Sequence, residues 1–212
     1  ELIKEGFVYI AQPPLFRIKK NKSELYLKDE KELDNYFIQE MVENSILKLK
    51  NGDVLKGDPL QDLFLNLNEF TSLLDEMSKN NENYKLLLEQ ATVANFFNKS
   101  NFQTKQKTKE TIDYTLKRLN FIDKYWNADF SSENYFKFTR EENKVIETFE
   151  IIKDDIEKDL YERLNGFSKI MQEFFLSPSS LSFKDEEQEI VTPRDLMNLS
   201  LELSKKGITV QR

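Results

Sequence analysis

Neither cysteine nor histidine occurs in this chain of 212 residues. Their absence excludes disulfides, zinc sites built from thiolates or imidazoles, and catalytic arrangements that use a cysteine nucleophile or a histidine base. Long apolar runs are missing too: none approaches the roughly 20 residues of a membrane helix, and no signal-peptide pattern is found. We therefore expect carboxylate chemistry or no chemistry, a cytoplasmic location and no membrane partner.

An excess of positive charge is also lacking, because the net charge is −7 and the sequence pI is near 5.0. Any contact with DNA must therefore come from a local basic patch. Apolar residues are abundant: 39% of the chain is hydrophobic, with 17 Phe and 8 Tyr, which is enough for a folded core. The first residue is Glu1 and not methionine, from which we expect a fragment of a longer protein.

The opening segment has the pattern of strands. Residues 7–11 form an apolar run rich in β-branched and aromatic side chains, and Pro13-Pro14 ends the run because proline cannot donate to a sheet. Residues 15–19 and 24–28 alternate around Asn21-Lys22, which predicts a hairpin with Asn21 at positive φ. A short helix is predicted over residues 29–39 from its apolar spacing.

The middle of the chain alternates hairpin and helix signals. Asn51-Gly52 between two apolar runs predicts a hairpin with a type I′ turn. Asp58 is the predicted N-cap of the next helix, with Pro59 at its first position. Further helices are expected over residues 84–97, 107–122 and 156–174, with a polar loop over 98–105. Another hairpin is expected to pair 135–138 with 145–152 through a charged turn at 140–143. A break is expected at 177–180.

The last helix carries the clearest signals. Thr192 is the predicted N-cap, Pro193 the first helical residue, and Gly207 the left-handed residue after the helix. Residues 208–210 read as a strand. The fold class predicted from these patterns is α+β, with strands and a hairpin at the two chain ends flanking a mixed domain of helices and antiparallel strands.

Four short motifs occur in a specific order: GFVYIAQPPLF at residues 6–16, the basic KKNK at 19–22, YLKD at 26–29, and ITVQR at the C-terminus. Together they closely resemble the later part of the Toprim domain in the B subunit of bacterial DNA gyrase, and the same region of the topoisomerase IV B subunit is similar. Two residues depart from that pattern: Phe16 where the family often has Tyr, and Asn21 in place of a turn glycine.

The resemblance implies a division of the chain. Residues 1–40 would be the C-terminal portion of the Toprim domain, residues 41–206 a large lineage-specific insert domain, and residues 207–212 the return strand. It also implies a parent protein that is an ATP-hydrolysing type II topoisomerase, which supercoils or relaxes DNA and uses magnesium and ATP. The implied partners are DNA, the A subunit of DNA gyrase and the ATPase region that belongs to the parent protein itself.

The catalytic parts of that family are absent from this chain. Its acidic magnesium motifs lie upstream of the AQPPL segment, its ATPase domain is a separate region, and its DNA-cleaving tyrosine belongs to the partner subunit. We therefore predict no catalytic residue, no metal ligand and no cofactor in this chain, and no activity of the chain alone.

The candidate DNA-contacting residues gather around the first hairpin. Residues 1–22 carry five basic and two acidic side chains, a local excess that can hold phosphates without reading sequence. A solvated hairpin without a partner is the alternative. The predicted DNA-binding residues are Gln12, Arg17, Lys19, Lys20, Lys22 and Arg212.

Two other patterns favour structural roles. Residues 141–190 carry 14 acidic and six basic side chains, and the acids after Ile152 imitate a magnesium motif, although acids are ordinary near helix N-termini. The aromatic residues predicted to be core, not base-stacking, are Phe64, Phe70, Phe96, Phe97, Trp126, Phe167, Phe174 and Phe175. Two alternatives stay open: the B subunit of topoisomerase IV, and a non-enzymatic interaction domain whose resemblance to gyrase is only local.

Overall fold

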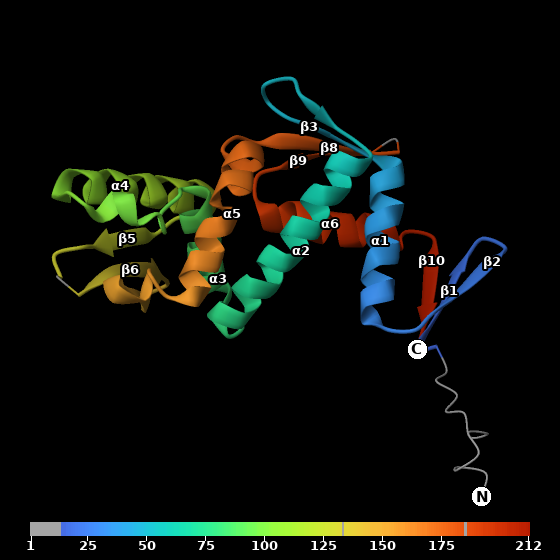
Figure 1. Ribbon diagram of the computed structural model, residues 1–212, viewed down its shortest axis with the longest axis horizontal. Coiled ribbons are helices and arrows are strands. Elements are labelled where there is room, and N and C mark those ends of the chain that lie inside the picture. The colour runs from blue at the N-terminus through green and yellow to red at the C-terminus, as the bar shows by residue number, and fades with distance from the viewer. Residues whose placement is uncertain (1–13, 133, 185) are drawn as a thin grey trace, which may run out of the picture.

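The computed structural model describes residues 14–132, 134–184 and 186–212; the predicted strand at residues 7–11 and Gln12 lie outside them. The molecule is long, with a small sheet that carries the C-terminus at one end and α4 with β5–β7 at the other (Figure 1). Its helices are α1 (Glu30–Asn44), α2 (Asp58–Ser78), α3 (Glu82–Val93), α4 (Lys105–Ile122), α5 (Asp159–Phe175) and α6 (Pro193–Lys205), with short 3-10 turns η1 (Lys99–Phe102) and η2 (Lys153–Asp155).

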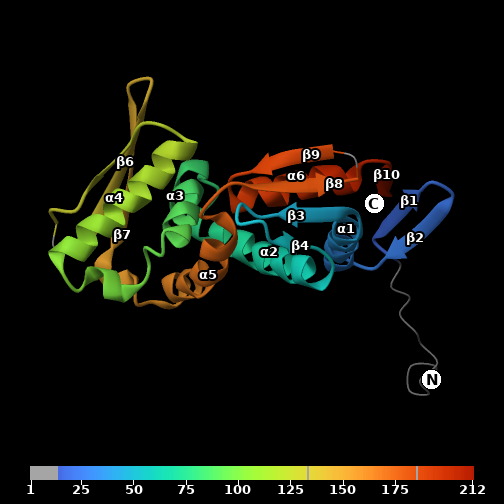
Figure 2. The same cartoon turned by 90° about the horizontal axis from the view of Figure 1, so that it is seen from above.

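The strands form three small antiparallel sheets, which confirms the α+β class (Figure 2). The first has the order β10 (Ile208–Gln211), β1 (Phe16–Lys20), β2 (Ser23–Leu27). The second has the order β4 (Val54–Leu55), β3 (Ser45–Lys48), β8 (Ser179–Phe183), β9 (Glu186–Ile190). The third has the order β5 (Trp126–Asp129), β6 (Tyr135–Glu142), β7 (Val145–Ile152).

Two separate cores hold these elements. Phe16, Ile18 and Leu27 make a small core under the first sheet, whereas the large core takes in residues from all six helices and the other two sheets. Helix α1 joins the two, because Leu33 packs on the small core and Met41 lies in the large one. The proposed domain boundaries near residues 40 and 206 stay predictions.

The predicted caps and turns are partly right. Thr192 accepts from the Asp195 N–H, Asn21 has φ 54°, and Gly207 has φ 77°, all as predicted; the Asp195 side chain also completes a capping box, which was not predicted. The N-cap prediction at Asp58 is wrong by one residue, because Gly57 occupies that position and α2 begins at Asp58. The Asp58-Pro59 signal therefore located the start of α2 to within one residue.

Both predicted hairpin turns in the middle of the chain differ from expectation. At Asn51-Gly52 only Gly52 has positive φ, and its N–H donates to the Leu49 carbonyl, so the loop is a type I turn followed by a left-handed glycine and not type I′. The β6–β7 turn lies at Asn143 and Lys144, whose φ values are 49° and 68°, and not at residues 140–143. A type I′ pair there lets β6 extend to Glu142.

Helix ends account for most of the remaining differences. Helix α3 stops at Val93 and not at 97, because Asn95 adopts φ 58° and the Phe96 N–H donates to the Ala91 carbonyl, as in a Schellman cap. Helix α1 runs five residues past its predicted end. Strands β5, β8 and β9 were not predicted, and β9 reads Glu-Glu-Gln-Glu-Ile, which has no strand-like alternation.

The aromatic prediction is confirmed. Trp126 is 3% exposed and lies in the large core. Phe64, Phe70, Phe96, Phe97 and Phe175 are buried there, and Phe167 and Phe174 pack against it half-buried. These rings are consequently not available to stack on bases.

Candidate nucleic-acid interface

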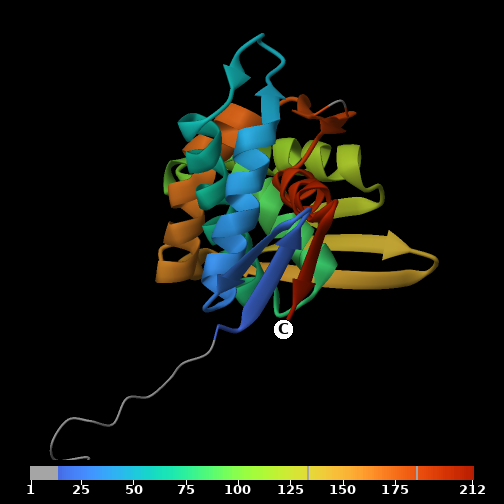
Figure 3. The same ribbon diagram turned by 90° about the vertical axis from the view of Figure 1, so that its right-hand side faces the viewer.

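The first sheet brings the predicted DNA-contacting hairpin and the return strand together, with α1 behind them (Figure 3). Strand β1 is central: Lys19 lies opposite Glu24 on β2 and Thr209 on β10. Because side chains alternate along a strand, Ile18 points into the small core, while Arg17 and Lys19 face outward. The outer face of this sheet is therefore the candidate interface.

Arg17 is neutralised on that face by a neighbouring acid. Its guanidinium donates to the two carboxylate oxygens of Glu24 at 2.6 and 3.2 Å. This hydrogen bond lowers the pKa of Glu24 and raises that of Arg17. A phosphate would have to compete with Glu24 for the guanidinium.

Lys20 points the other way, toward α1. Its ammonium group lies 2.6 Å from Glu40 Oε1, and the Glu40 side chain is only 15% exposed. The hydrogen bond to Glu40 raises the pKa of Lys20. The Lys20–Glu40 ion pair thus links the first hairpin to α1. Lys20 does not lie on the outward face that carries Lys19.

The remaining predicted contacts lie at the sheet's edges and tip. Lys19 and Lys22 are exposed and form no ion pair with a described residue. Arg212 pairs with Glu30 at 3.1 Å, and its guanidinium carbon lies 5.6 Å from the centre of the Phe16 ring. The structure therefore gathers Arg17, Lys19 and Lys22 around one hairpin and assigns acid partners to three of the five described candidates.

The acidic segment after Ile152 does not have the geometry of a metal site. Asp155 receives a hydrogen bond from Lys158, and Asp154 and Asp155 belong to the 3-10 turn η2. Within residues 14–132, 134–184 and 186–212, no three carboxylates are placed to hold one ion. The described residues thus do not fit the magnesium that the family resemblance implies for the parent protein.

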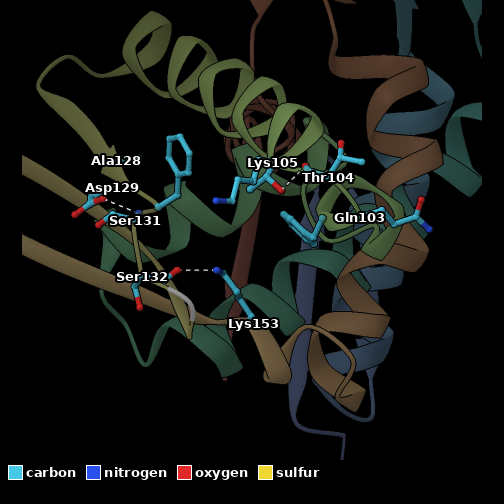
Figure 4. A pocket seen from close by; sticks show the side chains of 11 residues that line it. Gln103, Thr104, Lys105, Ala128, Asp129, Ser131, Ser132 and Lys153 are labelled. Carbon is cyan, nitrogen blue, oxygen red and sulfur yellow. Dashed lines mark hydrogen bonds between the residues drawn. The ribbon is translucent and has the colours of Figure 1, made fainter.

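A cleft of about 540 Å³ opens at the opposite end of the molecule, between the start of α4 and the end of β5 (Figure 4). Lys105 and Lys153 extend from its two walls toward the segment that carries Asp129 and Ser131. The Lys153 ammonium donates to the Ser132 carbonyl at 2.7 Å and lies 5.0 Å from the centre of the Phe136 ring. Its titratable lining residues are Lys105, Asp129 and Lys153, and no ion pair joins these three described side chains.

No family model matches the chain. Comparison with curated proteins, however, finds similarity along the whole chain. The DNA gyrase B subunit of Rickettsia prowazekii is 33% identical over 216 residues, covering 100% of this chain and 26% of that protein. The DNA gyrase B subunit of Caulobacter vibrioides is 28% identical over 217 residues, again covering 100% of this chain. The type 2 topoisomerase B subunit of Aquifex aeolicus is 40% identical over 70 residues, or 33% of this chain.

These relatives define a class, the B subunits of type 2 topoisomerases. Within it, the chain is homologous along its entire length to a segment of the B subunit of bacterial DNA gyrase. The similarity is not confined to the opening and closing motifs, so the competing idea of a merely local resemblance is wrong. The chain spans about a quarter of the length of these relatives.

Proposed function

We propose that this chain is a segment of an ATP-dependent type II DNA topoisomerase, in which the first sheet positions DNA and the inserted helical module couples the subunits to ATP turnover. The main support for this proposal is that the similarity to the DNA gyrase B subunit extends over the whole of this chain. The proposed partners are DNA, the gyrase A subunit, and the ATPase region of the parent protein. Magnesium and ATP would be held by parts of the parent outside these 212 residues, and a cytoplasmic location stays a prediction.

The DNA contact is proposed at the tip and outer face of the first sheet. Lys19 and Lys22 support it because they are exposed and form no ion pair with a described acid. Contacts of this kind position a duplex without reading its sequence. Lys20 is not part of the proposed contact, because its ammonium group pairs with Glu40 on α1. It is also left out of the test, because a glutamate at position 20 would place two carboxylates next to each other.

Lys19→Glu with Lys22→Glu in the parent protein should weaken DNA binding and reduce the dependence of log affinity on log salt by about 1.8, because each lost phosphate contact removes about 0.9. Fluorescence anisotropy with a labelled duplex between 50 and 200 mM salt measures this. Lys50→Glu with Lys56→Glu, two exposed lysines that flank the β3–β4 turn, is the control for net charge. An unchanged salt slope in the hairpin variant would refute the contact.

The module between the two ends of the first sheet is proposed as a docking or steric element. This proposal is supported by the packing of α1 on α6. Helix α1 directly follows β2 and α6 directly precedes β10, so a displacement of the module would also displace the first sheet. Replacing residues 41–206 by a short linker in the parent should leave the first sheet folded and lower DNA-stimulated ATPase or supercoiling several-fold. Normal supercoiling by that variant would make the module dispensable.

A further inference from the structure

Strand β7 is a long strand with one free edge. It pairs with β6 on one side, and no other described strand pairs with it. It has eight residues, whereas the other strands at the edges of the three described sheets have two to five. The tip of the β6–β7 hairpin projects beyond the helices in two different views (Figures 2 and 3). The free edge of β7 is therefore open to another strand.

The register of the β6–β7 ladder decides which backbone groups face that edge. Hydrogen-bonded and non-hydrogen-bonded pairs alternate along an antiparallel ladder. The Lys153 N–H donates to the Asn134 carbonyl at 2.9 Å, next to the last pair of this register, so the odd-numbered residues of β7 bond to β6. The backbone groups at the free edge belong to the even-numbered residues, all of which are exposed: Ile146, Thr148, Glu150 and Ile152.

Strand β7 lacks the features that usually protect an edge strand from pairing. It contains no lysine and no proline, the residues that natural edge strands use for this purpose. Val145 is 64% exposed, Ile146 61% and Ile152 48%. By contrast, β9 at the edge of the second sheet carries three glutamates in five residues. An apolar edge of this length is suited to the addition of a strand.

The sequence of β7 is complementary to itself about Phe149. An antiparallel copy centred on Phe149 places Ile146 opposite Ile152 of the second copy, and Thr148 opposite Glu150. These residues all direct their backbone groups to the free edge, so their hydrogen bonds match. The pairing would also cover the two exposed isoleucines, since each one lies three residues from the centre.

Charge selects this centre over its neighbours. With the centre at Phe149 no two acids face each other, and Glu150 keeps its place opposite Lys137 on β6. A centre at Thr148 would set Ile146 against Glu150. A centre at Glu150 would set that acid against its own copy, and like charges directly opposite are destabilising.

We propose that β7 pairs with β7 of a second copy of this chain, so that the two third sheets form one continuous sheet across a two-fold axis. The pairing supplies up to about eight backbone hydrogen bonds, and two-fold interfaces are the commonest in soluble oligomers. A strand of another protein could use the same hydrogen bonds, but the equal spacing of Ile146 and Ile152 from Phe149 favours a copy. The pairing uses no residue of the proposed DNA contact, so either proposal can fail alone.

The first test is sedimentation equilibrium of the full chain between about 5 and 500 µM. We expect a dimer with a Kd of about 10–100 µM, because one strand pair buries less than the roughly 1,200 Å² of a stable interface. Thr148→Pro removes an N–H from the free edge and none from the β6 ladder. It should raise the Kd about tenfold or more, since each dimer loses two hydrogen bonds.

Thr148→Ala is the matched control, because it removes the same side chain and keeps the N–H. It should change the Kd less than about threefold. A chain that stays monomeric at about 500 µM overturns the proposal, and so does an equal Kd in the two variants. Assembly beyond the dimer also overturns it, because each chain has one β7 and the pairing is closed.

The absence of cysteine permits a second test that does not depend on the proline variant. Thr148→Cys and Glu150→Cys each create a single thiol at an exposed position of β7. In the proposed pairing these positions form a hydrogen-bonded pair with Cα atoms about 5.5 Å apart, which is within the range of a disulfide. Mild oxidation of the mixed chains should therefore give the mixed dimer faster than either chain gives its own dimer. Equal rates, or a faster reaction of one variant alone, overturn the pairing.

Discussion

Phe96→Ala should lower the free energy of unfolding by about 3–5 kcal/mol, the usual cost of removing a buried aromatic ring. Phe96 is fully buried, and its ring contacts those of Phe97, Phe102, Phe136 and Phe138 at centroid distances of 5.3 to 5.8 Å. These rings come from the turn that follows α3, from the end of η1 and from β6. The substitution would leave a cavity where the helical layer meets the third sheet.

Phe121→Ala is the matched control, because it makes the same chemical change on a ring that is 70% exposed. Its effect should stay within about 0.5 kcal/mol. Urea unfolding followed by circular dichroism, with a common m-value, measures both variants. A loss below about 1 kcal/mol for Phe96→Ala would mean that the aromatic cluster does not hold the third sheet in place.

Glu89→Gln should change how stability depends on pH. The Glu89 side chain is fully buried on α3, where it accepts a hydrogen bond from the Arg194 N–H at 3.1 Å near the start of α6. Burial is the main cause that raises the pKa of Glu89, and the charge of Asp195 raises it further. The charge of Arg194 and the hydrogen bonds from Gln90 and Arg194 lower that pKa, but only in part. The native chain therefore holds the Glu89 proton to higher pH than the unfolded chain does.

The sign follows from proton linkage. Since the folded pKa lies above the unfolded one, the wild-type chain loses stability as pH rises from the unfolded carboxyl value, about 4.3, through the folded value. Glutamine does not titrate, so the stability of Glu89→Gln relative to wild type should rise over that window. The rise should be about 1.4 kcal/mol for every pH unit that separates the folded pKa from the unfolded pKa. A constant offset at every pH reports only the altered hydrogen bonds.

Urea unfolding at pH values from 4 to 8 measures this difference. Glu187→Gln is the control of opposite sign, because Ser180 and Lys48 lower the pKa of the exposed Glu187. Its stability relative to wild type should fall with rising pH, and by less than the Glu89→Gln change because Glu187 is exposed. A relative stability of Glu89→Gln that falls with pH would show that Arg194 outweighs burial.

Much of the backbone followed from local sequence. Thr192, Pro193 and Asp195 define the start of α6 because they can satisfy the free N–H groups of a first helical turn without help from elsewhere. Asn21 similarly defines the first hairpin turn, since asparagine tolerates positive φ. The family resemblance was likewise readable from short motifs and agrees with the full-length relatives.

Other boundaries depended on packing. Helix α1 continues past its predicted end because Met41 reaches the large core, a contact that its neighbours in sequence do not reveal. Strand β9 forms from a polar run because it can pair with the edge of β8 and because its last residue, Ile190, is buried in the core. Sequence patterns report one element at a time, whereas these elements exist because of a partner distant in the chain.

The candidate DNA contacts show the same division. By itself, the sequence determined that any contact must be local in an acidic chain, and it located one basic cluster at the first hairpin. Only the tertiary structure decided which charges are available: Glu24, Glu40 and Glu30 pair with Arg17, Lys20 and Arg212, while Lys19 and Lys22 form no ion pair with a described residue. The reason is physical, since charges that are remote in sequence cancel only when folding sets them within a few ångströms of each other.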